Sequence, residues 1–293
     1  MTLLQGRAYH DLVKAFVCAA ALGLILCGPA LIVAGAGGQV PAAQADAQTL
    51  GRLLALAADY CARLSRASID FVCLEDVSET IHDRAHGWPS QQFVTVEHHY
   101  LYDYQFIVEN GQKTEKRLIL ERDGIKKKAE VTDIDTLTFY YKNVLFGAVD
   151  LLDGSRQSLY RYESKGRETL AGQPALVIEA VPVPGLGLTV NRGTVWLREG
   201  DGAILKIVWD VTSMGDTEAI RKTAKEYGGT PRILQVTEFE IEKSGVRFPN
   251  RFHIEEAYIT KSGKKRVRSV LDAVYRDYKF FTVSVETPVI RRP

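Results

Sequence analysis

The stretch from Phe93 to Val108, FVTVEHHYLYDYQFIV, constrains the fold most strongly. Every second residue from Val94 onward is apolar, aromatic or histidine, and the residues between them form a more polar set, as in a half-buried strand. Ordinary strands have about 3–10 residues, whereas this one would reach roughly 53 Å if straight. A single domain accommodates such a strand by bending it. We therefore predict a strongly curved antiparallel sheet whose concave face carries an aromatic row: Tyr100, Tyr102, Tyr104 and Phe106.

The rest of the chain predicts a mainly β protein. Leucines and alanines recur at helical spacing over Gln48–Arg66, followed by an alternating strand at Ile69–Ile81. Short helices are expected at Tyr141–Leu152 and Asp216–Tyr227, and hairpin turns separate the remaining strands. These patterns predict an antiparallel sheet that forms an open half-barrel over the N-terminal helix and one or two short helices. Residues 46–293 are expected to form this single half-barrel β domain.

Residues 1–45 have the pattern of a secretory signal peptide. Arg7 and Lys14 precede the uncharged stretch Ala15–Gly38, and Ala43-Gln44-Ala45 offers a small-residue cleavage site. The alternative is a retained membrane anchor, because the stretch is long enough to span a bilayer. In both cases we expect the body of the protein to be exported, and thus periplasmic or secreted.

Two cysteines remain beyond the predicted signal, Cys61 in the helix and Cys73 on the apolar side of the next strand. An even pair in an oxidising compartment indicates a disulfide. Such a bridge would tie the helix to the sheet. The alternative is that the two cysteines supply half of the ligands of a metal site, but no CxxC motif accompanies the pair.

Charge argues against nucleic-acid binding, because 37 Lys and Arg balance 36 Asp and Glu. Two local basic clusters stand out, Lys126–Lys128 and Lys264-Lys265-Arg266 with Arg268. They would suit anionic lipid headgroups, or they are solvated hairpin ends that guard against edge pairing. Membrane contact is therefore expected only through the N-terminus or these basic hairpins.

No pattern predicts catalysis, a cofactor or a metal site. The sequence has neither a Gly-x-Ser-x-Gly motif nor a phosphate-binding loop. His98 and His99 point to opposite faces of their strand, and His82 and His86 lie beside Gly and Pro, so neither pair is placed to bind one metal ion. We expect these histidines to be hydrogen-bonded or exposed to solvent. The carboxylate pairs are expected at solvated strand positions; they are Glu238 with Glu240 and Glu255 with Glu256. Glu179, within the apolar run ALVIEAV, requires a partner unless it faces outward.

Three stretches resemble the superfamily of periplasmic lipoprotein localisation factors and related sigma-factor regulators. They are Leu159–Pro182 with its Ala-Gly-Gln turn, the hairpin Gly193–Trp209 with its acidic-Gly turn, and the terminal Tyr275–Val285. The resemblance implies an unclosed antiparallel half-barrel that folds over helices and cups acyl chains. It also implies a lipid, an acylated protein or another envelope protein as partner.

The leading hypothesis is a non-enzymatic carrier or sensor of an apolar or acylated ligand in the cell envelope. The ligand groove would be lined by the aromatic row with two tryptophans of neighbouring strands: Tyr100, Tyr102, Tyr104, Phe106, Trp196 and Trp209. The alternative is an envelope protein-interaction or scaffold module, in which the aromatic row is ordinary core filled by the chain itself.

Overall fold

A computed structural model of the whole chain gives the fold. The chain divides into two units, Met1–Val40 and Pro41–Pro293. The structure describes residues 42–66, 70–84, 93–109, 112–132, 136, 139, 141, 144–147, 149–184, 192–210 and 218–281, all in the second unit. Residues 1–41 of the predicted signal segment, His86 and the predicted hairpin turn at Asn110-Gly111 lie outside these residues.

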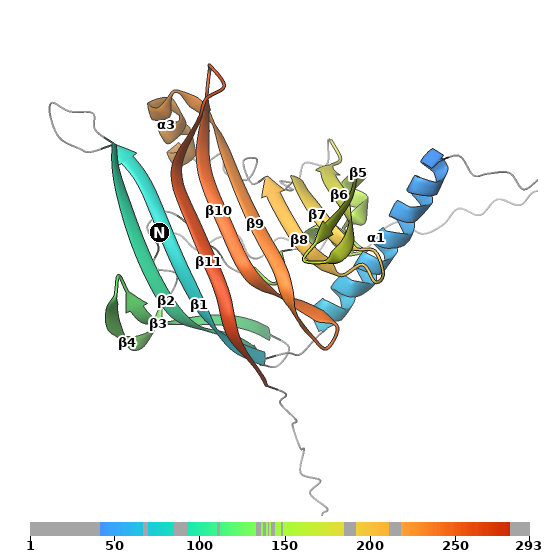
Figure 1. Cartoon of the computed structure of the whole chain (residues 1–293), viewed down its shortest axis with the longest axis horizontal. Helices are drawn as coiled ribbons and strands as arrows, with labels where there is room; N and C mark the ends of the chain where they lie inside the picture. The colour runs from blue at the N-terminus through green and yellow to red at the C-terminus, as the bar shows by residue number, and fades with distance from the viewer. Residues whose placement is uncertain are drawn as a thin grey trace, which may run out of the picture. The chain divides into compact units, whose positions relative to one another are not determined.

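One antiparallel sheet of eleven strands makes up most of the second unit (Figure 1). The strands are β1 (Asp70–Arg84), β2 (Phe93–Glu109), β3 (Gln112–Arg122), β4 (Ile125–Thr132), β5 (Tyr160–Leu170), β6 (Gln173–Pro182), β7 (Arg192–Arg198), β8 (Ile204–Asp210), β9 (Gly229–Lys243), β10 (Val246–Thr260) and β11 (Lys265–Phe281). Their order across the sheet is β4-β3-β2-β1-β11-β10-β9-β8-β7-β6-β5. The prediction of a mainly β, antiparallel fold is confirmed, and β2 coincides with the long aromatic strand. Its strong curvature stays a prediction.

In the described residues, three helices accompany the sheet: α1 (Ala42–Arg66), α2 (Val149–Leu152) and α3 (Glu218–Tyr227), with a 3-10 turn at Gln157–Leu159. The helix expected over Tyr141–Leu152 is therefore reduced to its last turn, and α3 matches its expected position. Because α1 begins at Ala42, the expected cleavage site Ala43-Gln44-Ala45 lies in its first turn. No helix within the described ranges is long and apolar enough to cross a membrane.

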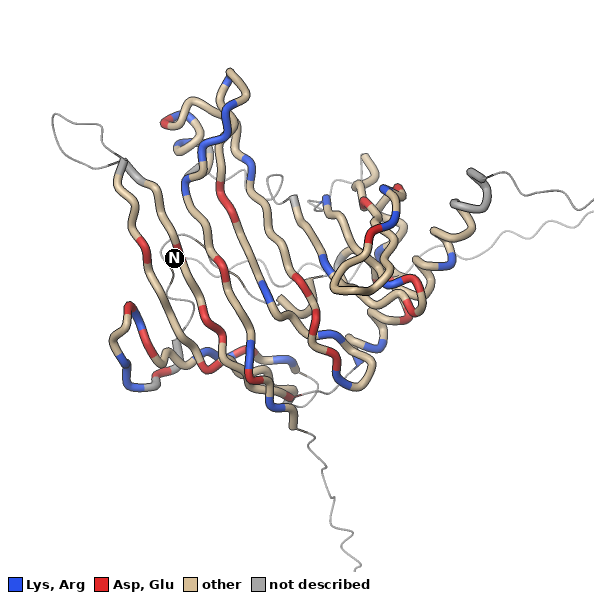
Figure 2. Tube along the Cα trace, viewed as in Figure 1, with Lys and Arg blue, Asp and Glu red and all other residues tan. Residues whose placement is uncertain are grey.

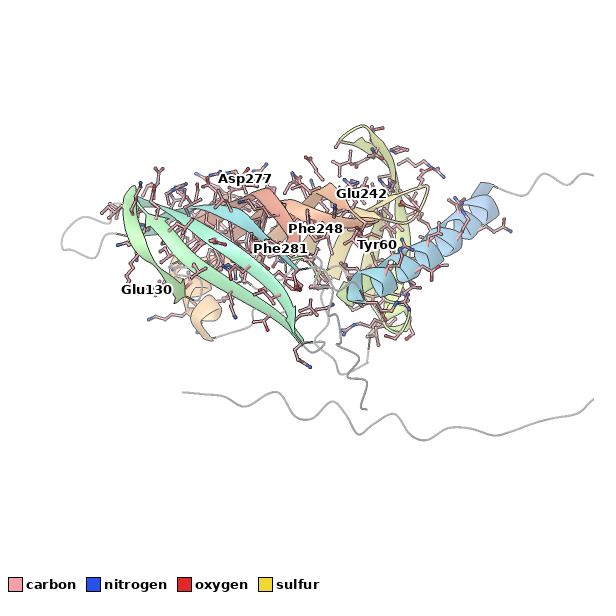
Figure 3. The ribbon with its side chains drawn as sticks, turned by 90° about the horizontal axis from the view of Figure 1, so that it is seen from below. Tyr60, Glu130, Glu242, Phe248, Asp277 and Phe281 are labelled. Carbon is pink, nitrogen blue, oxygen red and sulfur yellow. The ribbon has the colours of Figure 1, made fainter. Side chains whose placement is uncertain are left out.

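The hydrophobic core lies on the face of the sheet toward α1 and α2, which we call the inner face. On α1, Tyr60 accepts a hydrogen bond from the backbone N–H of Arg247 at 3.0 Å, so the helix lies beside the β9–β10 hairpin that carries Glu242 and Phe248 (Figure 3). At Gly202, a Cβ atom would come within 2.6 Å of the Ala57 backbone nitrogen, and the residue has a positive φ of 71°. Only glycine allows the β7–β8 turn to approach the helix this closely.

Candidate functional site

The predicted aromatic row lies on the inner face and is almost completely buried. Tyr100 and Tyr102 are 0% exposed, Phe106 is 1% exposed and Tyr104 is 4% exposed. Tyr100 and Tyr102 stack with ring centroids 6.1 Å apart, and Phe106 stacks on Phe71 of β1 at 5.4 Å. The row is thus part of one continuous cluster with α1 and the middle strands.

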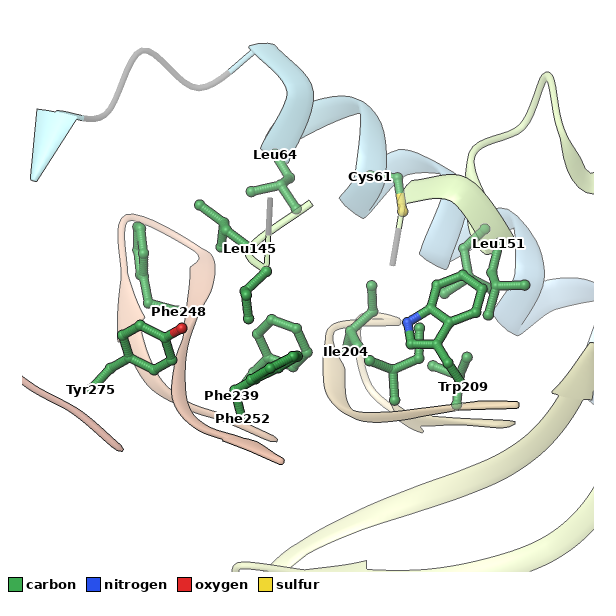
Figure 4. Close-up of a cluster of buried hydrophobic side chains, with 14 of the residues drawn as sticks. Cys61, Leu64, Leu145, Leu151, Ile204, Trp209, Phe239, Phe248, Phe252 and Tyr275 are labelled. Atoms are coloured by element: carbon green, nitrogen blue, oxygen red, sulfur yellow. The ribbon is translucent and has the colours of Figure 1, made fainter. Parts of the chain in front are cut away.

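The connection between β4 and β5 covers much of the row. Phe146 packs against Phe106 with centroids 5.4 Å apart, and Tyr141 stacks on Phe252 of β10 at 4.6 Å. Val144, Leu145, Leu151 and Leu152 of the same connection are buried in the same core cluster, and we call these six residues the plug. Leu145 lies between α1 and the phenylalanines of β9 and β10 in Figure 4. The plug therefore occupies part of the inner face on which an apolar ligand was expected.

A buried ion pair lies beneath the plug. Glu75 of β1 is 0% exposed and accepts hydrogen bonds from Arg117 Nε at 2.6 Å and from a second guanidinium nitrogen at 3.2 Å. The hydroxyls of Tyr275 and Tyr141 donate to the same carboxylate at 2.8 and 3.1 Å. Burial disfavours the charged guanidinium, but the adjacent Glu75 carboxylate outweighs it and raises the pKa of Arg117. Both buried charges are therefore compensated.

Aromatic rings surround this pair. The Arg117 guanidinium lies over the rings of Tyr104 and Tyr141, 4.8 and 5.2 Å from their centroids. The Tyr104 hydroxyl donates to Glu115 at 2.6 Å. Burial raises the pKa of Tyr104, Tyr141 and Tyr275 well above the ordinary value, so these hydroxyls remain donors.

Sequence reasoning missed this network, although one signal for it was present. A two-residue turn at Asn110-Gly111 makes Glu109 the partner of Gln112, and counting back along both strands brings Arg117 opposite Tyr104. The structure has this pairing. The position of Arg117 next to the aromatic row was thus predictable from the hairpin register.

The two predicted tryptophans lie on opposite faces. Trp209 is 5% exposed in the core, and its indole nitrogen would lie 3.6 Å from a Cβ at Gly147 of the β4–β5 connection. Trp196 is on the other face of the sheet, the outer face, because it neighbours the buried Val195 and Leu197. Its indole N–H donates to Glu168 at 2.7 Å. The structure therefore does not bring Trp196 together with the aromatic row.

Cys61 and Cys73 are both buried free thiols, so the structure does not contain the predicted disulfide. The reason is that they face different neighbours. Cys61 of α1 lies near Tyr162 and Asp153, whereas Cys73 of β1 is hydrogen-bonded with Tyr278. Burial raises the pKa of Cys61 to about 12 and raises that of Cys73 further, so both remain protonated at neutral pH.

The inner face is less covered where β2 begins. Val94 and Val96 are 46% and 41% exposed and continue the alternation of the aromatic row. Val96 is paired with Ile81 of β1, and His98 follows next to Glu79. This open end is an apolar surface that the described part of the chain leaves accessible.

The outer face carries charged side chains in pairs. Asp76 of β1 accepts from His99 at 2.6 Å and from Arg276 at 3.1 Å, and Asp272 of β11 accepts from His253 and Arg251 at 3.0 and 2.9 Å. The outer-face histidines thus have hydrogen-bond partners, as expected, and His82 contacts Thr95 at 3.0 Å. His98, in line with the inner-face row, contacts Asp123 at 3.1 Å. Among the described residues no group of three or more His, Cys, Asp or Glu side chains is arranged to hold a metal.

The expectation of solvated carboxylate pairs is wrong for Glu256. Its side chain is inward-facing and 6% exposed, and it accepts from Tyr258, from Ser269 at 3.2 Å and from Arg268 at 2.7 Å. Phe252 and Ile254, which precede it at every second position of β10, are also buried, so simple alternation places Glu256 on the same face. Glu179 has the partners that it requires, Lys165 at 2.6 Å and Arg192.

Solved structures similar to this chain include three from bacteria. A putative outer membrane lipoprotein-sorting protein domain from Vibrio parahaemolyticus has a TM-score of 0.35 and 10% identity over 80% of this chain and 94% of that one. A protein of the DUF1329 family from Desulfovibrio piger has a TM-score of 0.34 and 10% identity, covering 79% and 93%. A LolA superfamily protein from Nitrosomonas europaea has a TM-score of 0.31 and 11% identity, covering 80% and 94%.

The lipoprotein-sorting and LolA names agree with the resemblance found in the sequence. At these identities and TM-scores the likeness says nothing about what this chain binds. No family model and no curated protein matches the sequence.

Proposed function

We propose that this chain is a non-enzymatic cell-envelope protein that serves as a protein-interaction module. The observation that carries the proposal is the burial of the aromatic row at 0–4% exposure beneath the chain's own plug. An inner face occupied in this way is the core of the domain. The surface left for a partner is then the outer face.

The proposed contact surface is centred on Val274 of β11, which is 45% exposed. In the strand register Val274 lies between Asp76 of β1 and Arg251 of β10. An apolar centre with charged side chains around it has the anatomy of a protein interface, in which polar rim residues set orientation. The charges around Val274 include both signs, so a partner with a mixed polar rim fits better than a uniformly charged one.

Location in the envelope rests on the signal pattern of residues 1–45. An exported chain meets other envelope proteins, acylated proteins and lipids. The balanced total charge supports a protein partner over a nucleic acid.

A second candidate function is a carrier or sensor of an apolar or acylated ligand. The observation in its favour is the exposure of Val94 and Val96 on the inner face, in line with the aromatic row. A ligand entering at this end would meet Val96 and Ile81 first, and would reach the row only by displacing the plug. The ligand-lining role of the tyrosines is therefore tied to movement of the plug.

Site-specific photo-crosslinking tests the first candidate. A photoreactive amino acid in place of Val274 should yield one dominant crosslinked protein in the native host, and the same replacement of the exposed Lys127 of β4 should not. Val274→Asp should abolish co-purification of that protein with the full chain, whereas Lys127→Asp should leave it intact. Equal crosslinking at both positions would contradict the proposed surface.

Native mass spectrometry tests the second candidate on the same purified chain. A bound lipid that is retained by the parent and lost in Val96→Asp would favour the carrier. This variant is more informative than Tyr102→Asp, because Tyr102 is 0% exposed and a charge there disrupts the core. A parent chain free of lipid, with the Val274 crosslink present, supports the interaction module.

A further inference from the structure

The end of the sheet beside α3 contains a hollow of about 730 Å³. It lies where the C-terminal end of α3, the start of β9 and the end of β10 meet. Three cationic residues line it, one from each of these regions: Lys225, Arg232 and Lys261. Ala224, Pro231 and Ile259 add apolar surface, so the hollow combines positive charge with an apolar lining.

Backbone packing holds these elements together. Gly229 pairs with Thr260, and Arg232 pairs with Ala257 across the β9–β10 ladder. A Cβ atom at Gly229 would lie 2.8 Å from the Ile259 carbonyl oxygen, so glycine is required for this approach. On the helix side, Tyr227 stacks on Tyr258 of β10 with centroids 5.0 Å apart. The three cations therefore project from a packed framework.

Some cations at this end of the sheet are paired with carboxylates, whereas the three at the hollow have no such partner among the described residues. Lys265 is paired with Glu255 at 2.7 Å, and Arg268 is paired with Glu256 at 2.7 Å. Lys225, Arg232 and Lys261 are exposed, and within the described residues none of them forms an ion pair. Figure 2 shows Lys and Arg along α3 and the β10–β11 hairpin. An anion is the missing partner of this group.

Simpler roles explain only part of the arrangement. Lys225 in the last turn of α3 favourably opposes the negative end of the helix dipole, and Lys261 in the hairpin turn is a solvated charge of the ordinary kind. Neither role accounts for Arg232, which comes from a different strand and lines the same hollow. Guanidinium is the group best suited to phosphate, because its fork of N–H donors binds two oxygens at once.

We propose that this hollow binds the phosphate-bearing headgroup of an anionic lipid at a membrane surface. Arg232, Lys225 and Lys261 contact the phosphate, and Ala224, Pro231 and Ile259 contact the adjoining apolar part of the lipid. This site is separate from the outer-face contact surface around Val274. It would hold one end of the sheet at the membrane while the outer face remains available to a partner.

Vesicle co-sedimentation of the full chain tests the proposal. Phosphatidylcholine vesicles with and without about 30% phosphatidylglycerol are compared. The readout is the increment in vesicle-bound protein that the anionic lipid causes, because an apolar N-terminus inserts into both kinds of vesicle. Each neutralised cation should reduce that increment about five-fold. The variant Lys225→Gln/Arg232→Gln/Lys261→Gln should therefore lose it completely.

The matched control is Lys126→Gln/Lys127→Gln/Lys128→Gln in β4, at the other edge of the sheet, which removes the same charge. It should keep the increment, and the thermal unfolding midpoints of both variants should match the parent. Equal losses in both triple variants would overturn the proposal, since total charge would then explain the binding. Calorimetric binding of inorganic phosphate without an anionic-lipid increment would also overturn it, by assigning the hollow to a free anion.

Discussion

Glu75 and Asp76 are neighbours in β1, and each carboxylate binds an arginine, but they lie on opposite faces of the sheet. On the inner face the Glu75–Arg117 pair is 0% and 3% exposed and is joined by two tyrosine hydroxyls. On the outer face the Asp76–Arg276 pair is 28% and 46% exposed and shares Asp76 with His99. Water screens the outer pair, whereas only protein groups compensate the inner one.

This difference shows what each face is suited to. A charge pair under the plug depends on a fully assembled core, so it favours one arrangement of β1, β3, β11 and the plug over others. A charge pair in water can exchange its partner at little cost, as a contact surface requires. The comparison supports assigning binding to the outer face and structural specificity to the inner one.

Removing one partner of the inner pair should have the largest effect. Arg117→Met leaves Glu75 buried without its cation and should lower the free energy of unfolding by about 3–5 kcal/mol. Urea denaturation measures this. The double variant Glu75→Leu/Arg117→Met should be markedly more stable than Arg117→Met alone, because no uncompensated charge remains. The charges do not compensate each other if the double variant loses as much free energy of unfolding as Glu75→Leu and Arg117→Met lose when their separate losses are added.

Removing one hydroxyl from the same network should have an intermediate effect. Tyr275→Phe deletes a hydrogen bond to the Glu75 carboxylate and should cost about 1.5–3 kcal/mol. The matched control is Tyr278→Phe. That hydroxyl donates at 2.7 Å to the neutral Pro249 carbonyl, and its other partner, the Cys73 thiol, is also neutral. The control should therefore cost only about 0.5–1.5 kcal/mol. If the control costs as much as Tyr275→Phe, the charge of Glu75 is not what strengthens the bond.

The buried thiols should make the reduced protein less stable at alkaline pH. The folded pKa of Cys61 is raised to about 12 by burial, whereas an unfolded thiol ionises at about 8.5. Stability from this group is therefore complete below pH 8.5 and declines above it, by about 1 kcal/mol per thiol between pH 8.5 and 9.5. Urea titrations across this range measure the slope, and Cys61→Ala should reduce it. Alkylation of Cys61 and Cys73 in unreduced, denatured protein would confirm free thiols. If both cysteines resist alkylation, the predicted disulfide is present in the protein.

The outer pair should respond least. Arg276→Met should change the free energy of unfolding by about 0.2–1 kcal/mol, because the pair is exposed. The change should shrink further as salt is raised from 0.05 to about 1 M, where the screening length falls to about 3 Å. A loss of 3 kcal/mol would remove the contrast between the two faces.

Alternation and turn residues were sufficient to predict the antiparallel sheet, β2 and the position of α3. They also placed Tyr100, Tyr102, Tyr104 and Phe106 correctly on one apolar face. The sequence left two interpretations of this face open, a ligand groove or ordinary core, because the choice depends on what covers it. The plug comes from a connection whose sequence favoured a longer helix, so its path over Phe106 and Phe252 is set by tertiary packing.

Long-range pairing explains the other differences. Glu75 is 200 residues from Tyr275 in the chain, and no local pattern relates the two. The expected bridge between Cys61 and Cys73 relied on closeness in sequence, but α1 packs beside the β9–β10 hairpin while β1 pairs with β2 and β11. Trp196 and Trp209 lie on adjacent strands, and only the register of β7 against β8 places them on opposite faces.

The pairing of β1 with β11 also governs when the sheet can be completed. During synthesis at about 5–20 residues per second, Tyr275 appears about 10–40 s after Glu75. Until then β1 has a free backbone edge, and Glu75 lacks one of its hydrogen-bond donors. The β1–β4 meander can form locally, but closing the sheet requires a contact across most of the chain, which slows folding. A long interval before completion places final folding after the last strand has arrived.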